Sequence, residues 1–132
     1  MEVKRKSKGL AFGLLVSLGV VLDQAVKSRA VIQEVGVVIN KGVAWGLGED
    51  KSFISISLGL LGLILLKFKL GWQTGLIMIG GVSNLIDRIR WGGVVDFLSF
   101  FQITKFNLAD IVIILGVGGL IFKEIYGSKD SL

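Results

Sequence analysis

Three aspartates, Asp87, Asp96 and Asp110, lie inside or beside strongly apolar sequence between residues 80 and 110. A carboxylate near hydrocarbon is expensive to keep ionised, so acids in such a setting are candidates for a functional site. Two carboxylates that share one proton can activate water for attack on a peptide carbonyl: one takes a proton from the water while the other donates to the carbonyl oxygen. We therefore predict that residues 80–110 form the active site of a membrane-embedded aspartic peptidase.

Asp96 and Asp110 are the stronger candidates for this chemistry. Asp96 lies between valines and a phenylalanine with no adjacent cation, so a partner from elsewhere in the chain is expected. Asn107 and Asp110 have the spacing of a capping box at the start of a helix, and this capping role and a chemical role carry equal weight. The helix dipole favours negative charge at Asp110, which makes it the better candidate for the ionised base.

Two further polar groups are expected to support the site. Asn84, Asp87 and Arg88 share one face of a helix, and Arg88 would neutralise Asp87 in a polar cluster at the helix end. Asp23 and Lys27 have the spacing of a helical ion pair. That pair either ends a membrane span at the interface or supports the site.

Composition limits the class of protein and the chemistry. Hydrophobic residues make up 52% of the 132 residues and charged residues only 19%, which indicates an integral membrane protein. Cysteine and histidine are absent, so thiol nucleophiles, histidine bases and thiolate or histidine metal sites are excluded. We predict no metal and no cofactor. The net charge of +5 fits membrane topology better than nucleic-acid binding, because the cations lie at the ends of apolar runs.

The apolar runs predict one all-α membrane domain over residues 1–132, with four transmembrane helices at about 8–28, 51–68, 70–90 and 107–126. The basic residues before the first apolar run are also typical of a signal peptide. The residues after that run continue as a helix, however, which favours a membrane span that is not cleaved off. Residues 29–50 are rich in valine, isoleucine and glycine, which predicts a small extracytoplasmic β-like segment between the first two helices, with Asn40 and Trp45 as its distinctive side chains.

The distribution of cations predicts the orientation in the membrane. The basic residues of the N-terminal head, of the loop near residue 68 and of the C-terminal end would share one side, which the positive-inside rule makes cytoplasmic. Both termini are therefore expected in the cytoplasm. With this topology Asp23, Asp87, Asp96 and Asp110 all converge on the extracytoplasmic face.

Five motifs in this order resemble the lipoprotein signal peptidase family, also called signal peptidase II. They are Asp23-Gln24-x-x-Lys27, Asn40-Lys41-Gly42-Val43-Ala44-Trp45-Gly46, Asn84-Leu85-Ile86-Asp87-Arg88, Val94-Val95-Asp96-Phe97 and Phe106-Asn107-Leu108-Ala109-Asp110.

The resemblance implies that Asp96 and Asp110 are the catalytic dyad, and that Asp23, Asn40, Asn84, Arg88 and Asn107 support the pocket or contact substrate. It implies removal of the signal peptide from a diacylglyceryl-modified bacterial prolipoprotein, just before the lipidated cysteine. The protein would act as a monomer in contact with lipid in the bacterial inner membrane. The alternative from length and hydropathy is a four-helix transporter or channel subunit, although its acids would be expected near mid-membrane.

Overall fold

The computed structural model describes residues 2–34, 36–42 and 52–127, so the predictions for Trp45 and Lys51 fall outside the described residues. The chain is mostly helical, as predicted, with small β-hairpins at one end. The helices are α1 (Glu2–Ile32), α2 (Ser52–Lys67), α3 (Trp72–Trp91) and α4 (Leu108–Tyr126), and the strands are β1 (Val38–Asn40), β2 (Val94–Asp96), β3 (Leu98–Phe100) and β4 (Thr104–Phe106).

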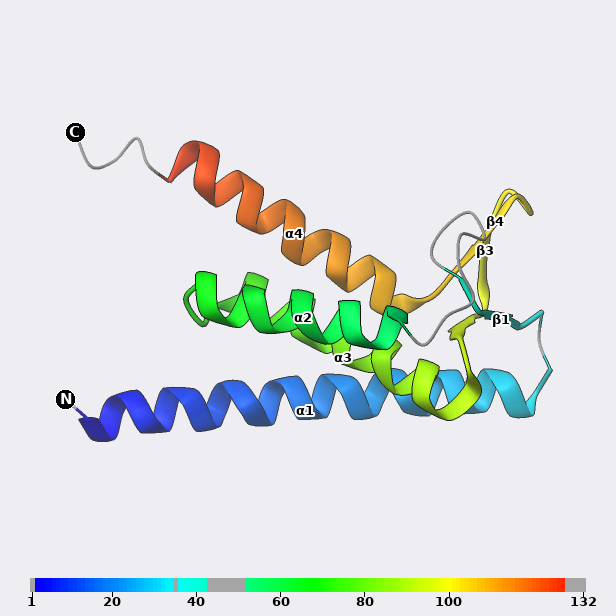
Figure 1. The fold of residues 1–132 in the computed structure, drawn as a ribbon, viewed down its shortest axis with the longest axis horizontal. Coiled ribbons are helices and arrows are strands. Elements are labelled where there is room, and N and C mark those ends of the chain that lie inside the picture. Colours follow the sequence, from blue (N-terminus) through cyan, green and yellow to red (C-terminus); the bar gives the residue numbers. More distant parts are fainter. Residues whose placement is uncertain (1, 35, 43–51, 128–132) are drawn as a thin grey trace.

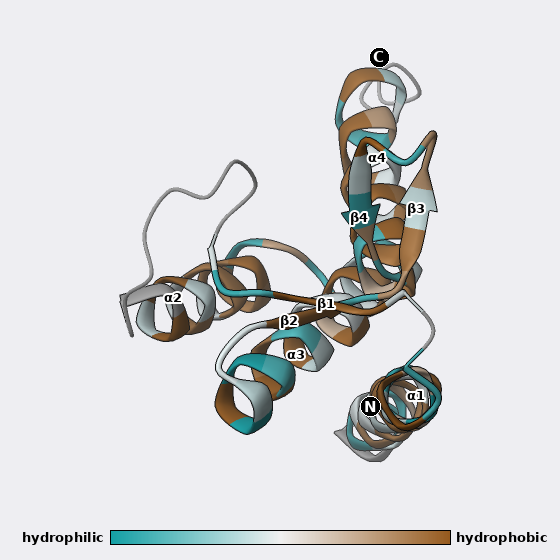
Figure 2. Ribbon diagram, turned by 90° about the vertical axis from the view of Figure 1, so that its right-hand side faces the viewer, coloured by the Kyte–Doolittle hydropathy of each residue, from teal (hydrophilic) through white to brown (hydrophobic). Residues whose placement is uncertain are grey.

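Helix α3 is the centre of the bundle. It packs against α1, α2 and α4, and the view along the bundle shows the other three helices around it (Figure 2). The contact with α4 is close, because a Cβ atom on Gly80 would lie 2.4 Å from the carbonyl oxygen of Ala109, and one on Gly116 would lie 2.7 Å from that of Gln73. Small residues at these points let the two backbones approach, as is common between membrane helices.

The polarity of the bundle is the reverse of that in a water-soluble domain. The buried side chains include Asp23, Lys27, Asn84, Asp87 and Asn107. Large hydrophobic side chains instead cover the outer faces of the helices. Those more than half exposed include Leu10, Leu14, Leu15 and Leu18 on α1, Ile56, Leu60, Leu63 and Leu66 on α2, and Ile114, Leu115, Ile121 and Phe122 on α4. Contiguous apolar surface of this extent requires an apolar environment.

By length and composition, one helix among the described residues qualifies as a membrane span, Lys6–Ile32, and Ile54–Lys67 is a shorter apolar helix. Helices α3 and α4 carry charges near their ends, with Arg88 and Arg90 in the last turn of α3, and Asp110 in the first and Lys123 in the last turn of α4.

The strands differ from the prediction for residues 29–50. Helix α1 continues to Ile32, and β1 pairs antiparallel with β2, with Asn40 opposite Val94. A second antiparallel pair, β3 with β4, places Leu98 opposite Phe106, and the sequence analysis missed it. The β1–β2 pairing could not be predicted because its strands lie more than fifty residues apart, and the three-residue strands of the β3–β4 pair are too short to show a clear alternation.

The strands gather at one end of the bundle (Figure 1). The beginning of α1 and the end of α4 both lie toward the opposite end, apart from each other. The last turns of α1 and α3 and the first turn of α4 therefore meet the strands, and they bring the polar motifs to one end of the molecule.

Candidate active site

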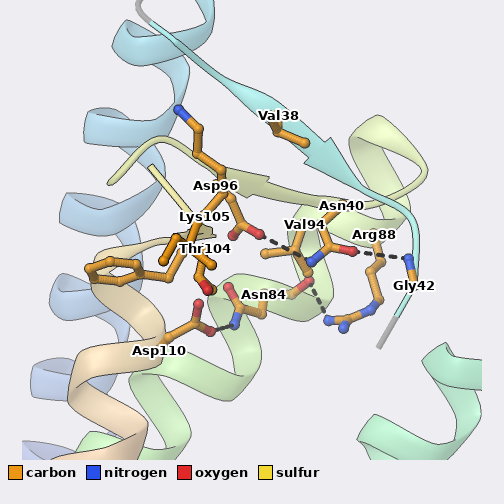
Figure 3. Close-up of a pocket in the computed structure, with 12 residues that line it drawn as sticks. Val38, Asn40, Gly42, Asn84, Arg88, Val94, Asp96, Thr104, Lys105 and Asp110 are labelled. Atoms are coloured by element: carbon orange, nitrogen blue, oxygen red, sulfur yellow. Dashed lines mark hydrogen bonds between the residues drawn. The ribbon is translucent and has the colours of Figure 1, made fainter. Parts of the chain in front are cut away.

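A pocket of about 680 Å³ opens where the strands meet α3 and α4. Both Asp96 and Asp110 line it, and their side chains point into it (Figure 3). The other lining residues are Val38, Asn40, Gly42, Asn84, Arg88, Val94, Ile103, Thr104, Lys105 and Phe106. The two acids come from different elements, β2 and the first turn of α4, so the pocket exists only when the strands dock on the helices.

Asp96 ends strand β2 and is only 3% exposed. Two side-chain amides donate to its carboxyl group: Asn107 Nδ2 to Oδ1 at 2.8 Å and Asn40 Nδ2 to Oδ2 at 3.2 Å. Burial raises the pKa of Asp96 above its ordinary value, the two amide donors lower it in part, and the negative charge of Asp110 raises it further. The setting therefore favours a proton on Asp96.

Asp110 lies in the first turn of α4 and performs the predicted capping role. Its backbone N–H donates to Asn107 Oδ1 at 3.0 Å, and its Oδ2 accepts from the Asn107 backbone N–H at 3.2 Å, which completes a capping box. Its other oxygen, Oδ1, accepts from Asn84 Nδ2 at 2.9 Å. Capping and presentation to the pocket are thus compatible, because the cap fixes the direction in which this carboxyl group points.

Asn107 joins the two acids. Its side-chain oxygen caps α4 at Asp110 while its amide nitrogen donates to Asp96, and the residue is fully buried. One side chain therefore sets the position of β2 relative to α4. The motif predicted that Asn107 supports the site, but the sequence could not show that it contacts both carboxyl-bearing residues.

The partner of Asp87 is different from the one expected. Lys27 Nζ lies 2.7 Å from Asp87 Oδ2 and 2.9 Å from Asp23 Oδ2, and all three residues are buried. Arg88 instead donates to the backbone carbonyl of Asn84 at 3.2 Å and lines the pocket. The prediction that Arg88 neutralises Asp87 was wrong. Of the two interpretations of the Asp23–Lys27 pair, its burial and its contact with Asp87 favour support of the site.

Two supporting residues were missed. Gln24 Nε2 donates to Asp87 Oδ1 at 2.6 Å and to Ser83 Oγ at 2.9 Å, and Ser83 Oγ donates to Asp23 Oδ2. The sequence did contain a signal for them, because both are polar residues within apolar helical sequence and each is next to a candidate site residue. Within residues 2–34, 36–42 and 52–127, no cluster of three or more His, Cys, Asp or Glu side chains could hold a metal ion.

Comparison with known proteins decides the family. A sequence profile described as signal peptidase (SPase) II matches residues 15–126 of the chain. The chain belongs to the signal peptidase II family. Its relatives include the lipoprotein signal peptidase of Clostridium tetani, 33% identical with 78% of this chain and 85% of the relative covered, and that of Halothermothrix orenii, 34% identical with 82% and 90% covered.

The fold is also found in solved structures. Two bacterial membrane enzyme structures obtained by the in meso method superpose with TM-scores of 0.77 and 0.75 at 23% and 24% identity. The first match covers 92% of each chain, and the second covers 88% of this chain and 93% of the other. Membership in this aspartic peptidase family accounts for paired acids at one end of the bundle, which the alternative of a transporter subunit does not.

Proposed function

We propose that Asp96 and Asp110 are the catalytic dyad that hydrolyses a peptide bond in this pocket. The observation that carries the proposal is that both carboxyl groups line one pocket while separate amides hold them in place. Asp110, at the positive end of the α4 dipole, is ionised and takes a proton from water as the water oxygen attacks the scissile carbonyl carbon. Asp96 donates its proton to the carbonyl oxygen, which gives a tetrahedral diol.

The second half of the reaction returns the dyad to its starting state. The carbon–nitrogen bond breaks as the leaving nitrogen takes the proton held by Asp110, and a diol hydroxyl returns a proton to Asp96. The dyad holds one proton before and after the cycle. Arg88 and Asn40 lie on the pocket wall, where their donors are suited to carbonyl groups of an extended substrate.

The proposed substrate is the signal peptide of a bacterial prolipoprotein that carries a diacylglyceryl-modified cysteine, cut just before that cysteine. Relatives named lipoprotein signal peptidase support this choice. The hydrophobic outer faces of the helices suit the acyl chains and the surrounding lipid. The protein is proposed to act as a monomer.

Four transmembrane helices and an extracytoplasmic pocket complete the proposal. The exposed aliphatic faces on α1, α2 and α4 support immersion of the whole bundle, and α3 at its centre has little surface left for lipid. The basic N-terminal head and Lys67 lie at the ends of helices away from the pocket, which supports cytoplasmic termini. The domain then spans residues 1–132 as one membrane-embedded unit.

Cleavage is expected to depend on the lipid of the substrate. Acyl chains in the bilayer would place the scissile bond at the height of the pocket, so an unlipidated precursor should be cut at least about tenfold more slowly, because correct placement is a large part of catalysis. The measurement is the initial cleavage rate of matched precursors, with and without the diacylglyceryl group, by purified enzyme in one detergent. Equal rates would contradict the lipidated-substrate proposal.

The orientation can be tested with single cysteines, since the natural chain has none. Ser99 in β3 and Ser7 near the start of α1 are both exposed, and serine to cysteine changes the side chain little. Ser99→Cys should react with an impermeant thiol reagent added outside intact spheroplasts, and Ser7→Cys should react only after lysis. The reverse pattern would overturn the proposed topology.

The raised pKa of Asp96 predicts the alkaline side of the pH–rate profile. Asp96 must be protonated to act as the acid, so kcat should fall as pH rises through its pKa. Asn40→Ala removes a donor that stabilises the ionised form, so it should raise the pKa of Asp96 and move the alkaline limb to higher pH. A limb that moves to lower pH in Asn40→Ala would show that Asp96 is not the acid.

A further inference from the structure

We propose that Lys27 is a positioning residue that holds both acids of the dyad at once, an inference that rests on the proposed function. The lysine is 1% exposed, in the second half of α1, and its side chain is absent from the pocket wall. Its ammonium nitrogen lies within 2.9 Å of three acceptors: Asp23 Oδ2, Asp87 Oδ2 and Asn84 Oδ1 at 2.8 Å. An ammonium group has three N–H donors, so each is matched by one acceptor.

The first branch of this arrangement runs to Asp110. An asparagine amide has one accepting and one donating end, and Lys27 requires the accepting end of Asn84 to face it. The donating end, Asn84 Nδ2, must then face Asp110 Oδ1, where it lies at 2.9 Å. Without the lysine, the Asn84 amide could rotate and turn its oxygen toward the carboxylate of Asp110, which would repel it.

The second branch runs to Asp96. Lys27 holds Asp87 Oδ2, and the same oxygen accepts from the backbone N–H of Val95 at 3.1 Å. Val95 is fully buried and directly precedes Asp96 in β2. This bond ties the strand that carries Asp96 to α3, so the position of Asp96 depends on the same ammonium group.

A lysine is well suited to this place, because its three donors meet acceptors from both α1 and α3. The polar network contains Asp23 and Asp87 against one lysine, and their negative charge compensates the cost of burying an ammonium group. Arg90 donates to Gln24 Oε1 at 3.1 Å, on the outside of the network. A buried cation between α1 and α3 thus controls two branches that end at opposite sides of the pocket.

Lys27→Met alone leaves two buried carboxylates without their cation and is expected to fold poorly. The informative variant is therefore Asp23→Asn/Lys27→Met, which keeps the formal charge of the network at its natural value, compared with Asp23→Asn alone. Lys67→Met, at the exposed end of α2, is the control for loss of a lysine. The thermal unfolding midpoint, kcat and KM are measured for each variant with the same lipidated precursor and detergent.

We expect Asp23→Asn/Lys27→Met to remain folded and to show kcat about 10–100-fold below that of Asp23→Asn, with KM within about twofold, because misplaced groups reduce chemistry more than binding. In a background that also carries Asn84→Ala, removing Lys27 should lower kcat by a clearly smaller factor, because the branch to Asp110 is already lost. An unchanged kcat, a rise in KM alone, or full additivity with Asn84→Ala would overturn the inference. None of these results would contradict the proposed dyad, because the dyad is tested separately by variants at Asp96 and Asp110.

Discussion

Replacing either Asp96 or Asp110 by asparagine should lower turnover by about a thousandfold or more, which is the largest effect expected in this protein. Asparagine has nearly the shape of aspartate but cannot exchange a carboxyl proton, so it removes the acid or the base from the proposed cycle. General acid–base groups each contribute about 10²–10⁴-fold to rate. The rate to be measured is single-turnover cleavage of a lipidated precursor by purified enzyme.

The same variants should stay folded, which separates loss of chemistry from loss of structure. In Asp110→Asn the side-chain oxygen can still accept from Asn84, and the backbone N–H at this position still reaches the Asn107 cap. Thermal unfolding in the assay detergent should therefore show a small change only. If either single variant keeps turnover close to that of the natural protein, the dyad assignment is wrong.

Asp87→Asn should give the second large effect, on stability instead of chemistry. Asp87 is fully buried, and its carboxylate accepts from Lys27, Gln24 and the Val95 backbone. Removing its charge weakens a buried ion pair and leaves an unmatched donor, and breaking such a pair costs about 3–5 kcal/mol of the free energy of unfolding.

The expected pattern for Asp87→Asn is a lower unfolding midpoint and yield, with residual cleavage by the fraction that folds. Glu124→Gln, at an exposed position near the end of α4, is the matched control and should not change stability. An Asp87→Asn protein as stable as the natural one would show that the buried pair does not stabilise the bundle.

The helices could be predicted because their cause is local. Long apolar runs bounded by charges determine α1 to α4, and the errors are a few residues at the ends, such as the continuation of α1 to Ile32. The polar cap of α4 is also local, since Asn107 and Asp110 are three residues apart and their types identify the motif.

The partners of buried charges could not be predicted, because they depend on how helices pack. Asp87 and Arg88 are adjacent in sequence, yet successive side chains on a helix point about 100° apart. Asp87 consequently faces α1 and Lys27, while Arg88 faces the pocket. Spacing did identify the Asp23–Lys27 pair, but whether that pair lies at the surface or in the interior follows from the position of α3.

The strands were the least predictable part for the same reason. β1 pairs with β2 across more than fifty residues, so neither strand has its partner nearby in sequence. The β3–β4 hairpin is short, and its turn has Phe101 and Gln102 at positive φ without a glycine to mark it.

The most direct test of the central claim, that Asp96 and Asp110 act as one unit, is the turnover of the double variant Asp96→Asn/Asp110→Asn beside the two single variants. Groups that act as a unit are strongly non-additive, because removing either one already stops the reaction that needs both. We predict that the double variant is no slower than the slower single variant. A double variant whose loss equals the product of the two single losses would contradict the account.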